Sequence, residues 1–272
     1  MTRELSSGIN LKGPLQLSGS AGTSGQVLTS AGANAVPTWT PAGGFTGGTL
    51  TGNLTLASGT TSLSPLTFQS GTNLTTATAG AVEYDGKVIY TTPNGRGVSP
   101  SMMFYRLNSD LAGANVTTAQ KLFGVGVTLA ANTVYAFQMV FSLIKTAGAS
   151  THSISIGFDG GTATINNLHA IGTLSNIQGA LPTSNSQTTS SFYYGAHTNT
   201  AQVIYATGIA GATRSETGVF NGTVSINAGG TFIPQYQLST APGGAYSTIA
   251  GSYFAIWPIG AAGANTSVGP WA

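Results

Sequence analysis

The side chains that could carry acid–base or metal chemistry are few and widely spaced along this 272-residue sequence. Its carboxylates are Glu4, Glu83, Asp85, Asp110, Asp159 and Glu216, and its histidines are His152, His169 and His197. Glycoside hydrolysis needs a pair of carboxylates, and a metal centre needs several ligands at one place. The spacing predicts neither, and the G-x-S-x-G, H-E-x-x-H, P-loop and EF-hand patterns do not occur. We therefore predict that the protein is not an enzyme and has no catalytic residues, no cofactor and no metal ion.

Several of these residues have a simple structural explanation. Asp85 and Asp159 each precede a glycine between β-rich runs, where a carboxylate stabilises the turn itself. We expect each histidine to face solvent or to be hydrogen-bonded. Glu83 and Asp110 would form a catalytic pair only if the fold brought them together. A polysaccharide depolymerase is kept as the enzymatic alternative, and substitution of Glu83, Asp110 and Glu216 would test it.

Charge is scarce in this sequence. Charged residues make up 5% of the chain, against roughly 25% in an ordinary soluble domain. The eight cations and six acids give a net charge of +2 and are scattered, so we expect no nucleic-acid binding. A surface made of Thr, Ser, Asn and Gln suits a protein built into an assembly.

Redox chemistry and membranes are also predicted to play no part. The chain has no cysteine, which excludes disulfides and thiolate zinc sites. The N-terminal MTRELSSGIN carries an acid and no apolar core, so we expect no signal peptide and synthesis in a cytoplasm. The longest apolar stretch, VYAFQMVFSLI at 134–144, is shorter than the ~20 residues of a membrane helix, so we predict no membrane insertion.

The elements that must position any site are predicted to be strands. Residues 21–65 are rich in Gly, Ser, Thr and Leu, which indicates short strands and turns, with a disordered linker as the alternative. Residues 66–112 contain Asp85–Gly86 between two β-rich runs, which predicts a two-residue hairpin turn with both residues at positive φ, and a second turn at Asn94–Gly95.

Residues 113–272 have the pattern of a compact all-β domain. In TVYAFQMVFSLIK, one face of a strand carries Tyr135, Phe137 and Phe141, and the other face is also apolar, so both faces must be covered. Pro234 and Pro258 each require a strand end, an edge or a bulge. Short strands separated by Gly and Pro turns predict a β-sandwich or jelly roll.

Four segments resemble bacteriophage tail fibres and related virion appendages, in the order expected of such proteins. They are GTSGQVLTSAGANAVPTWT at 22–40, FTGGTLTGNLTL at 45–56, PLTFQSGTNLTTATAGAVEYDGKVIYTTP at 65–93 and GTFIPQYQLSTAPGGAYSTIAGSYFAIWPIG at 230–260. The resemblance covers about half of the chain. It implies a homotrimer with a thin intertwined shaft and a jelly-roll-like head of the TNF/C1q type. The chain departs from many tail fibres in being far shorter.

The resemblance divides the chain into a virion-attachment segment at 1–20, a shaft at 21–65, a connecting region at 66–112 and a head at 113–272. It implies that apolar residues of shaft and head make subunit contacts, because a strand too short to bury its leucines can bury them against symmetry mates. The predicted trimer contacts are Trp39, Leu50, Leu54, Leu56, Tyr135, Phe137 and Phe141. The segment SSFYYGAHTNT is the predicted receptor-facing loop, through Phe192, Tyr193, Tyr194 and His197.

The expected function is therefore a structural virion protein that is made in the host bacterial cytoplasm. Its N-terminus would bind another virion protein of the tail, baseplate or capsid, and its head would bind a host surface glycan. The alternative from the same particle is a capsid decoration or head-fibre protein that stabilises or decorates the head.

Overall fold

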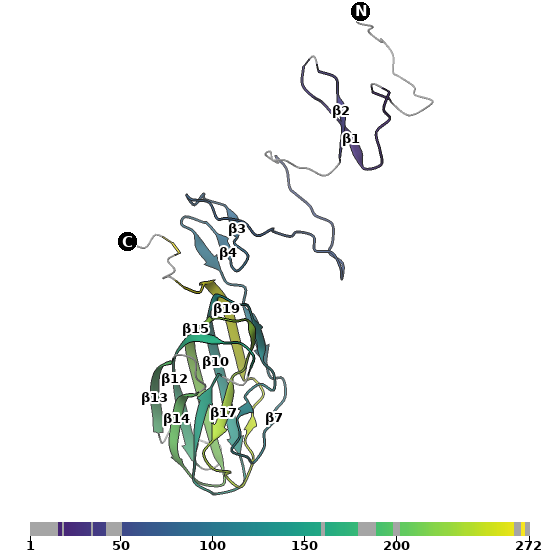
Figure 1. Ribbon diagram of the computed structural model, residues 1–272. Helices are drawn as coiled ribbons and strands as arrows, with labels where there is room; N and C mark the ends of the chain where they lie inside the picture. The colour runs from purple at the N-terminus through teal and green to yellow at the C-terminus, as the bar shows by residue number, and fades with distance from the viewer. Residues whose placement is uncertain are drawn as a thin grey trace, which may run out of the picture. The chain divides into compact units, whose positions relative to one another are not determined.

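The computed structural model describes residues 16–17, 19–33, 35–41, 51–158, 161–178, 189–197, 202–263 and 268–269. Within these ranges every regular element is a β-strand, which confirms the all-β prediction. None of the described residues forms a helix long and apolar enough to cross a membrane. The chain divides into two compact units, Met1–Leu66 and Thr67–Ala272 (Figure 1).

The described part of the first unit contains one hairpin. Strand β1 (Gln26–Thr29) pairs antiparallel with β2 (Thr38–Pro41), and Leu28 lies opposite Trp39. The Trp39 ring covers Gly22, whose φ is +71° and where an added Cβ would lie 2.8 Å from Trp39 Cδ2. Trp39 Nε1 also donates to the Ser20 carbonyl at 3.1 Å. The ring therefore fixes the chain that leads into the hairpin.

Residues 51–81 contain no strand. The short strands predicted for the 51–65 part of the shaft are therefore not formed by the single chain. The physical reason is the lack of a pairing partner, since a strand of a few residues is stable only when its backbone groups and its apolar face are both covered.

A small three-stranded sheet follows, made of β3 (Val82–Tyr84), β4 (Ile89–Thr91) and β5 (Gly97–Ser99). The predicted hairpin at Asp85–Gly86 is confirmed, but its turn is wider than predicted, because Tyr84 pairs with Ile89. Only Gly86 has a positive φ, at +91°. Asp85 Oδ1 accepts the N–H groups of Lys87 and Val88, both at 2.8 Å, so the carboxylate stabilises the turn as expected.

Two larger sheets pack face to face in the rest of the second unit (Figure 1). The first has the order β13-β12-β15-β10, after which both β18 and β19 pair with β10, β7 pairs with β18, and β6 pairs with β19. Its strands are β6 (Met103–Arg106), β7 (Leu111–Ala112), β10 (Thr133–Lys145), β12 (Ile165–Gln178), β13 (Thr189–His197), β15 (Arg214–Ile226), β18 (Ser247–Thr248) and β19 (Tyr253–Ala261). Strands β6 and β7 lie before residue 113, so the described sandwich begins earlier than the predicted head.

The second sheet has the order β14-β11-β17-β8, and a two-stranded ribbon of β9 and β16 accompanies it. Its strands are β8 (Gln120–Lys121), β11 (His152–Gly157), β14 (Gln202–Ile209) and β17 (Gln235–Leu238), and those of the ribbon are β9 (Val127–Leu129) and β16 (Gly230–Phe232). Phe137 on β10 contacts Phe158 just after β11, with ring centroids 5.0 Å apart. The two sheets thus enclose one apolar core.

The positions of the two prolines agree with the prediction. Pro258 lies opposite Tyr135 at a register shift between β10 and β19, which is a bulge. Pro234 lies between β16 and β17, at a strand end. Neither position requires a ladder hydrogen bond from the missing N–H.

Candidate functional site

The apolar residues predicted as shaft contacts differ in exposure. Trp39 is half-buried within its own hairpin, and Leu50 lies outside the described residues. Leu54 and Leu56 are 65% and 41% exposed. The same stretch of chain exposes four further large apolar side chains: Leu63, Leu66, Phe68 and Leu74. Residues 54–74, which lie partly in the first unit and partly in the second, therefore carry six exposed apolar side chains, and we call this stretch of sequence the apolar row.

The prediction that Tyr135, Phe137 and Phe141 make subunit contacts is wrong. These rings are 4%, 2% and 1% exposed and belong to the core of their own chain. Strand β10 alternates strictly, with its odd-numbered residues buried and its even-numbered residues half-buried. The second sheet covers the odd-numbered face, so only the even-numbered face is left for another copy.

No charged side chain lies on the even-numbered face of β10 or on the same face of its direct neighbours. Lys145 belongs to the odd-numbered face of β10, and Arg214 and Glu216 of β15 pair with residues of that face. Gln138 Nε2 donates to Asn221 Oδ1 at 3.3 Å, and the Tyr253 hydroxyl donates to Gln138 Oε1 at 2.9 Å. Two apolar side chains near the β12 side of the sheet are open to solvent, Ile171 at 54% and Val219 at 38%. We call this surface the uncharged sheet face.

The predicted receptor-facing loop is also corrected, because most of it is strand. Phe192, Tyr193, Tyr194 and His197 lie on β13, which pairs with β12 at the border of the first sheet. In the backbone register, Tyr194 is opposite Ile171 and Tyr193 is opposite Gly172. The side chains of β13 lie outside the described residues. Sequence reasoning missed this strand because Ser190, Ser191 and Gly195 interrupt its alternation.

An apolar groove runs beside β6, with a volume of about 200 Å³. Its lining comes from β6, β19, residues 123–127 and Pro234, and includes Met103, Tyr105, Phe123, Val127 and Phe254. No charged or histidine side chain lines it, so it offers no acid–base chemistry.

The carboxylates and histidines do not converge within the described residues. No three of their His, Asp and Glu side chains gather as a metal site would require. Glu83 binds Arg96, with Oε2 2.9 Å from Arg96 Nε, while Asp110 Oδ1 accepts the Ala250 N–H at 2.8 Å. Glu4 and Asp159 lie outside the described residues. The pair of Glu83 and Asp110 thus has two separate structural roles.

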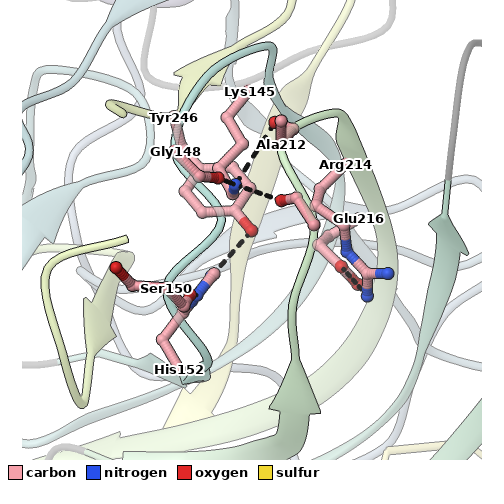
Figure 2. Close-up of polar contacts among 9 residues, drawn as sticks. Lys145, Gly148, Ser150, His152, Ala212, Arg214, Glu216 and Tyr246 are labelled. Carbon is pink, nitrogen blue, oxygen red and sulfur yellow. Dashed lines mark hydrogen bonds and ion pairs between the residues drawn. The ribbon is translucent and has the colours of Figure 1, made fainter. Parts of the chain in front are cut away.

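Within the described residues, a buried charged cluster forms a polar site that the sequence did not predict. It lies where β10 ends and β15 begins, and its charged members Lys145, Arg214 and Glu216 are 1%, 3% and 0% exposed (Figure 2). Lys145 Nζ donates to the carbonyl oxygens of Ala147 at 3.2 Å, Gly211 at 2.6 Å and Ala212 at 3.3 Å, and also to that of Gly148. One ammonium group therefore joins the loop after β10 to the loop before β15.

The remaining members of the cluster are an acid, a guanidinium and a neutral imidazole. Arg214 Nη2 lies 3.3 Å from Glu216 Oε1, and Glu216 Oε2 has no hydrogen-bond partner in the described part of the chain. His152 Nδ1 lies 2.8 Å from the Ser150 carbonyl, which can only accept, so in the neutral ring Nδ1 donates and Nε2 accepts from the Tyr246 hydroxyl at 2.9 Å.

Burial dominates the electrostatics of the cluster. It raises the pKa of Glu216 to about 7, although Arg214 opposes this shift. It lowers the pKa of His152, and the positive charges of Lys145 and Arg214 add to this effect, whereas the Ser150 carbonyl opposes it. Burial also lowers the pKa of Lys145.

The cluster has the composition of an acid–base site but not its accessibility. Glu216 and the two cations are closed off from solvent, so a substrate cannot reach them. The pattern of β10 contained a signal that could have revealed it, because Lys145 is in the same alternating register as Tyr135 and Phe141. The arrangement serves to hold two loops together at one end of the sandwich.

The fold and these sites define an all-β protein with a sandwich domain. No protein-family model matches the chain, and no curated protein matches it. Two solved structures of infectious bursal disease virus are similar to part of it. The structure of the Gx strain has 8% identity and a TM-score of 0.16, and covers 61% of this chain and 43% of that chain.

The crystal structure of the VP2 subviral particle of the same virus has 8% identity and a TM-score of 0.14, with coverage of 61% of this chain and 44% of that chain. The chain thus spans less than half the length of either viral chain. At such low TM-scores and identities the likeness carries no conclusion about fold or function.

Proposed function

We propose that this chain is the structural subunit of a virion appendage of a tailed bacteriophage, a short fibre or fibre tip that assembles as a homotrimer. The observation that carries the proposal is the apolar row of residues 54–74. Leu63 is 71% exposed and Leu66 is 55% exposed, without a covering element in the described chain. Complete burial of one exposed side chain of this size stabilises a protein by about 1.5–3 kcal/mol, so covering these residues against symmetry mates would favour association.

The head is proposed to be a jelly roll. The strand order supports this: β6, β10, β15 and β19 fall in one sheet, and β8, β11, β14 and β17 fall in the other. The first of these eight strands pairs with the last, and the second pairs with the next to last. Strands β12 and β13 then extend the first sheet as an inserted hairpin.

The uncharged sheet face is the proposed contact between heads. It exposes Ile171 and Val219 beside polar but uncharged groups such as Gln138 and Asn221. A surface without charges can approach its own copy without desolvating an ion, which favours self-association.

We propose that a host glycan binds at the end of the head where the buried charged cluster lies. Lys87, in the β3–β4 turn, donates to the Ala131 carbonyl and to Thr133 Oγ1, both at 3.1 Å. The small β3–β5 sheet therefore adjoins the first residues of β10, and Lys145 marks the opposite end. The loops at that opposite end lie at the other end of β10 from the small β3–β5 sheet, and we propose that they meet the receptor.

Sedimentation equilibrium of the full chain tests the trimer, and we expect a mass near three chains. The double substitution Leu54→Ser with Leu63→Ser should shift the equilibrium toward the monomer, because both side chains belong to the apolar row. The matched control is Thr55→Ser with Thr61→Ser, which leaves the apolar row intact. A stable monomer of the unsubstituted chain at micromolar concentration would contradict the proposal.

Labelling of intact particles with an antibody to the chain tests its place on the virion. We expect the label at the tail. A label spread over the whole capsid would instead assign the chain to the decoration or head-fibre class.

A further inference from the structure

The chain contains two Asn–Gly pairs, Asn94–Gly95 and Asn221–Gly222. In such a pair the backbone nitrogen of the glycine can attack the asparagine side-chain carbonyl, because glycine has no Cβ to hinder the approach. Both pairs share the following glycine, which is the local feature that favours this attack. The structural surroundings of the two pairs differ.

Asn94–Gly95 lies in the open turn between β4 and β5. The strands pair up to Thr91 and Gly97, which leaves residues 92–96 outside the ladder. Asn94 is exposed, and neither its side chain nor the N–H of Gly95 makes a hydrogen bond within the described residues. The backbone at Gly95 is therefore free to rotate toward the Asn94 side chain.

Asn221–Gly222 lies inside β15, a strand paired on both sides. Asn221 is opposite Gln138 on β10 and Ile171 on β12, and its Oδ1 accepts a hydrogen bond from Gln138. A Cβ at Gly222 would lie 2.2 Å from the His169 carbonyl oxygen, so the neighbouring strand closely approaches this backbone. The ladder and this packing hold Asn221 extended, and ring closure would require the sheet to open.

We propose that Asn94 is a site of spontaneous deamidation in the folded protein and that Asn221 is protected. The Gly95 nitrogen attacks Asn94 Cγ, forming a carbon–nitrogen bond and a five-membered succinimide, and the side-chain amide leaves as ammonia. Water then adds to one of the two ring carbonyls and breaks its bond to nitrogen. The product is either aspartate or isoaspartate, in which the main chain runs through the former side chain.

The modification would place a new carboxylate two residues before Arg96. Arg96 binds Glu83 through Nε at 2.9 Å and donates from Nη2 to the Leu74 carbonyl at 2.5 Å. A second anion beside this guanidinium, or the longer main chain of isoaspartate, would compete with contacts that hold residues 74 and 83 together.

Peptide mapping of the full chain during incubation at mildly alkaline pH, below its unfolding temperature, tests the inference. Trypsin releases Val88–Arg96, which contains Asn94, and chymotrypsin releases 221–232, which contains Asn221. We expect aspartate and isoaspartate to accumulate in the first peptide at a rate roughly tenfold or more above that of the second. The reason is that ring closure at Asn221 requires its strand to open locally first.

Two controls make the result decisive. In denaturant the two pairs should react at similar rates, which shows that the difference comes from the fold. Gly95→Ala should slow the reaction at Asn94, since the added methyl group hinders attack, and φ of Gly95 is not positive. Equal rates at Asn94 and Asn221 in the folded chain, or an unmodified Asn94, would overturn the inference.

Discussion

Residues 54–74 and strand β10 use the same kinds of apolar side chain and reach opposite outcomes. In β10 the odd-numbered residues are almost completely buried, whereas the leucines of residues 54–74 stay largely in water. The difference does not lie in hydrophobicity. Strand β10 has β15 and β19 as neighbours and a second sheet across the core, while residues 54–74 have no paired strand within the described chain. Apolar residues are buried only where the chain supplies a covering surface, and residues 54–74 have none within the described chain.

The largest effect should come from removing a core ring. Phe137→Ala deletes a side chain that is 2% exposed and contacts Phe158 and Phe254. We expect the free energy of unfolding to fall by about 3–5 kcal/mol, as for other buried aromatic deletions. Urea denaturation followed by circular dichroism measures it.

The matched control is Phe104→Ala, which removes the same ring at a position 57% exposed and stacked on Tyr253. The expected loss is below about 1 kcal/mol. A loss as large as that of Phe137→Ala would show that the β6 edge is covered by another copy.

The next effect concerns the buried charged cluster and its dependence on pH. Burial raises the pKa of Glu216 from 4.5 to about 7, so its contribution to stability is complete below pH 4.5 and is lost as the pH rises through about 7. Glu216→Gln cannot ionise. Above pH 7 we expect the free energy of unfolding of the variant to exceed that of the wild type by up to about 3 kcal/mol, at roughly 1.4 kcal/mol per pKa unit.

Denaturant titrations at a series of pH values measure this difference, which should shrink toward zero below pH 4.5. Glu83→Gln is the control of opposite sign, because the Leu74 N–H and Arg96 lower the pKa of Glu83. At pH values above the ordinary pKa of a glutamate, Glu83→Gln should lower the free energy of unfolding. A difference for Glu216→Gln that stays constant with pH would contradict the assignment.

The smallest effect is local to the first unit. Gly22→Ala places a methyl group 2.8 Å from the Trp39 ring at a backbone φ of +71°, so the ring must move. We expect a local cost of about 1–2 kcal/mol and a changed Trp39 signal in fluorine NMR of fluorotryptophan-labelled protein. Gly25→Ala has a similar φ of +84° but no atom within 4 Å of the added Cβ, so the Trp39 signal should stay unchanged.

Sequence reasoning succeeded where the signal is local. The alternation of β10, the Asp85 turn and the positions of Pro234 and Pro258 all follow from a few adjacent residues, and the structure has each of them. It missed strand β13, because Ser190, Ser191 and Gly195 interrupt the alternation and the strand is defined by its pairing with β12.

The sequence by itself determined that this protein is all-β and poor in charge. Only the tertiary structure decided which face of β10 is covered, and that Lys145, Arg214 and Glu216 share one buried cluster. The physical reason is that backbone preferences and alternation act over a few residues. Burial and the pKa of an ionisable group depend instead on strands that are dozens of residues apart in the chain and adjacent in the fold.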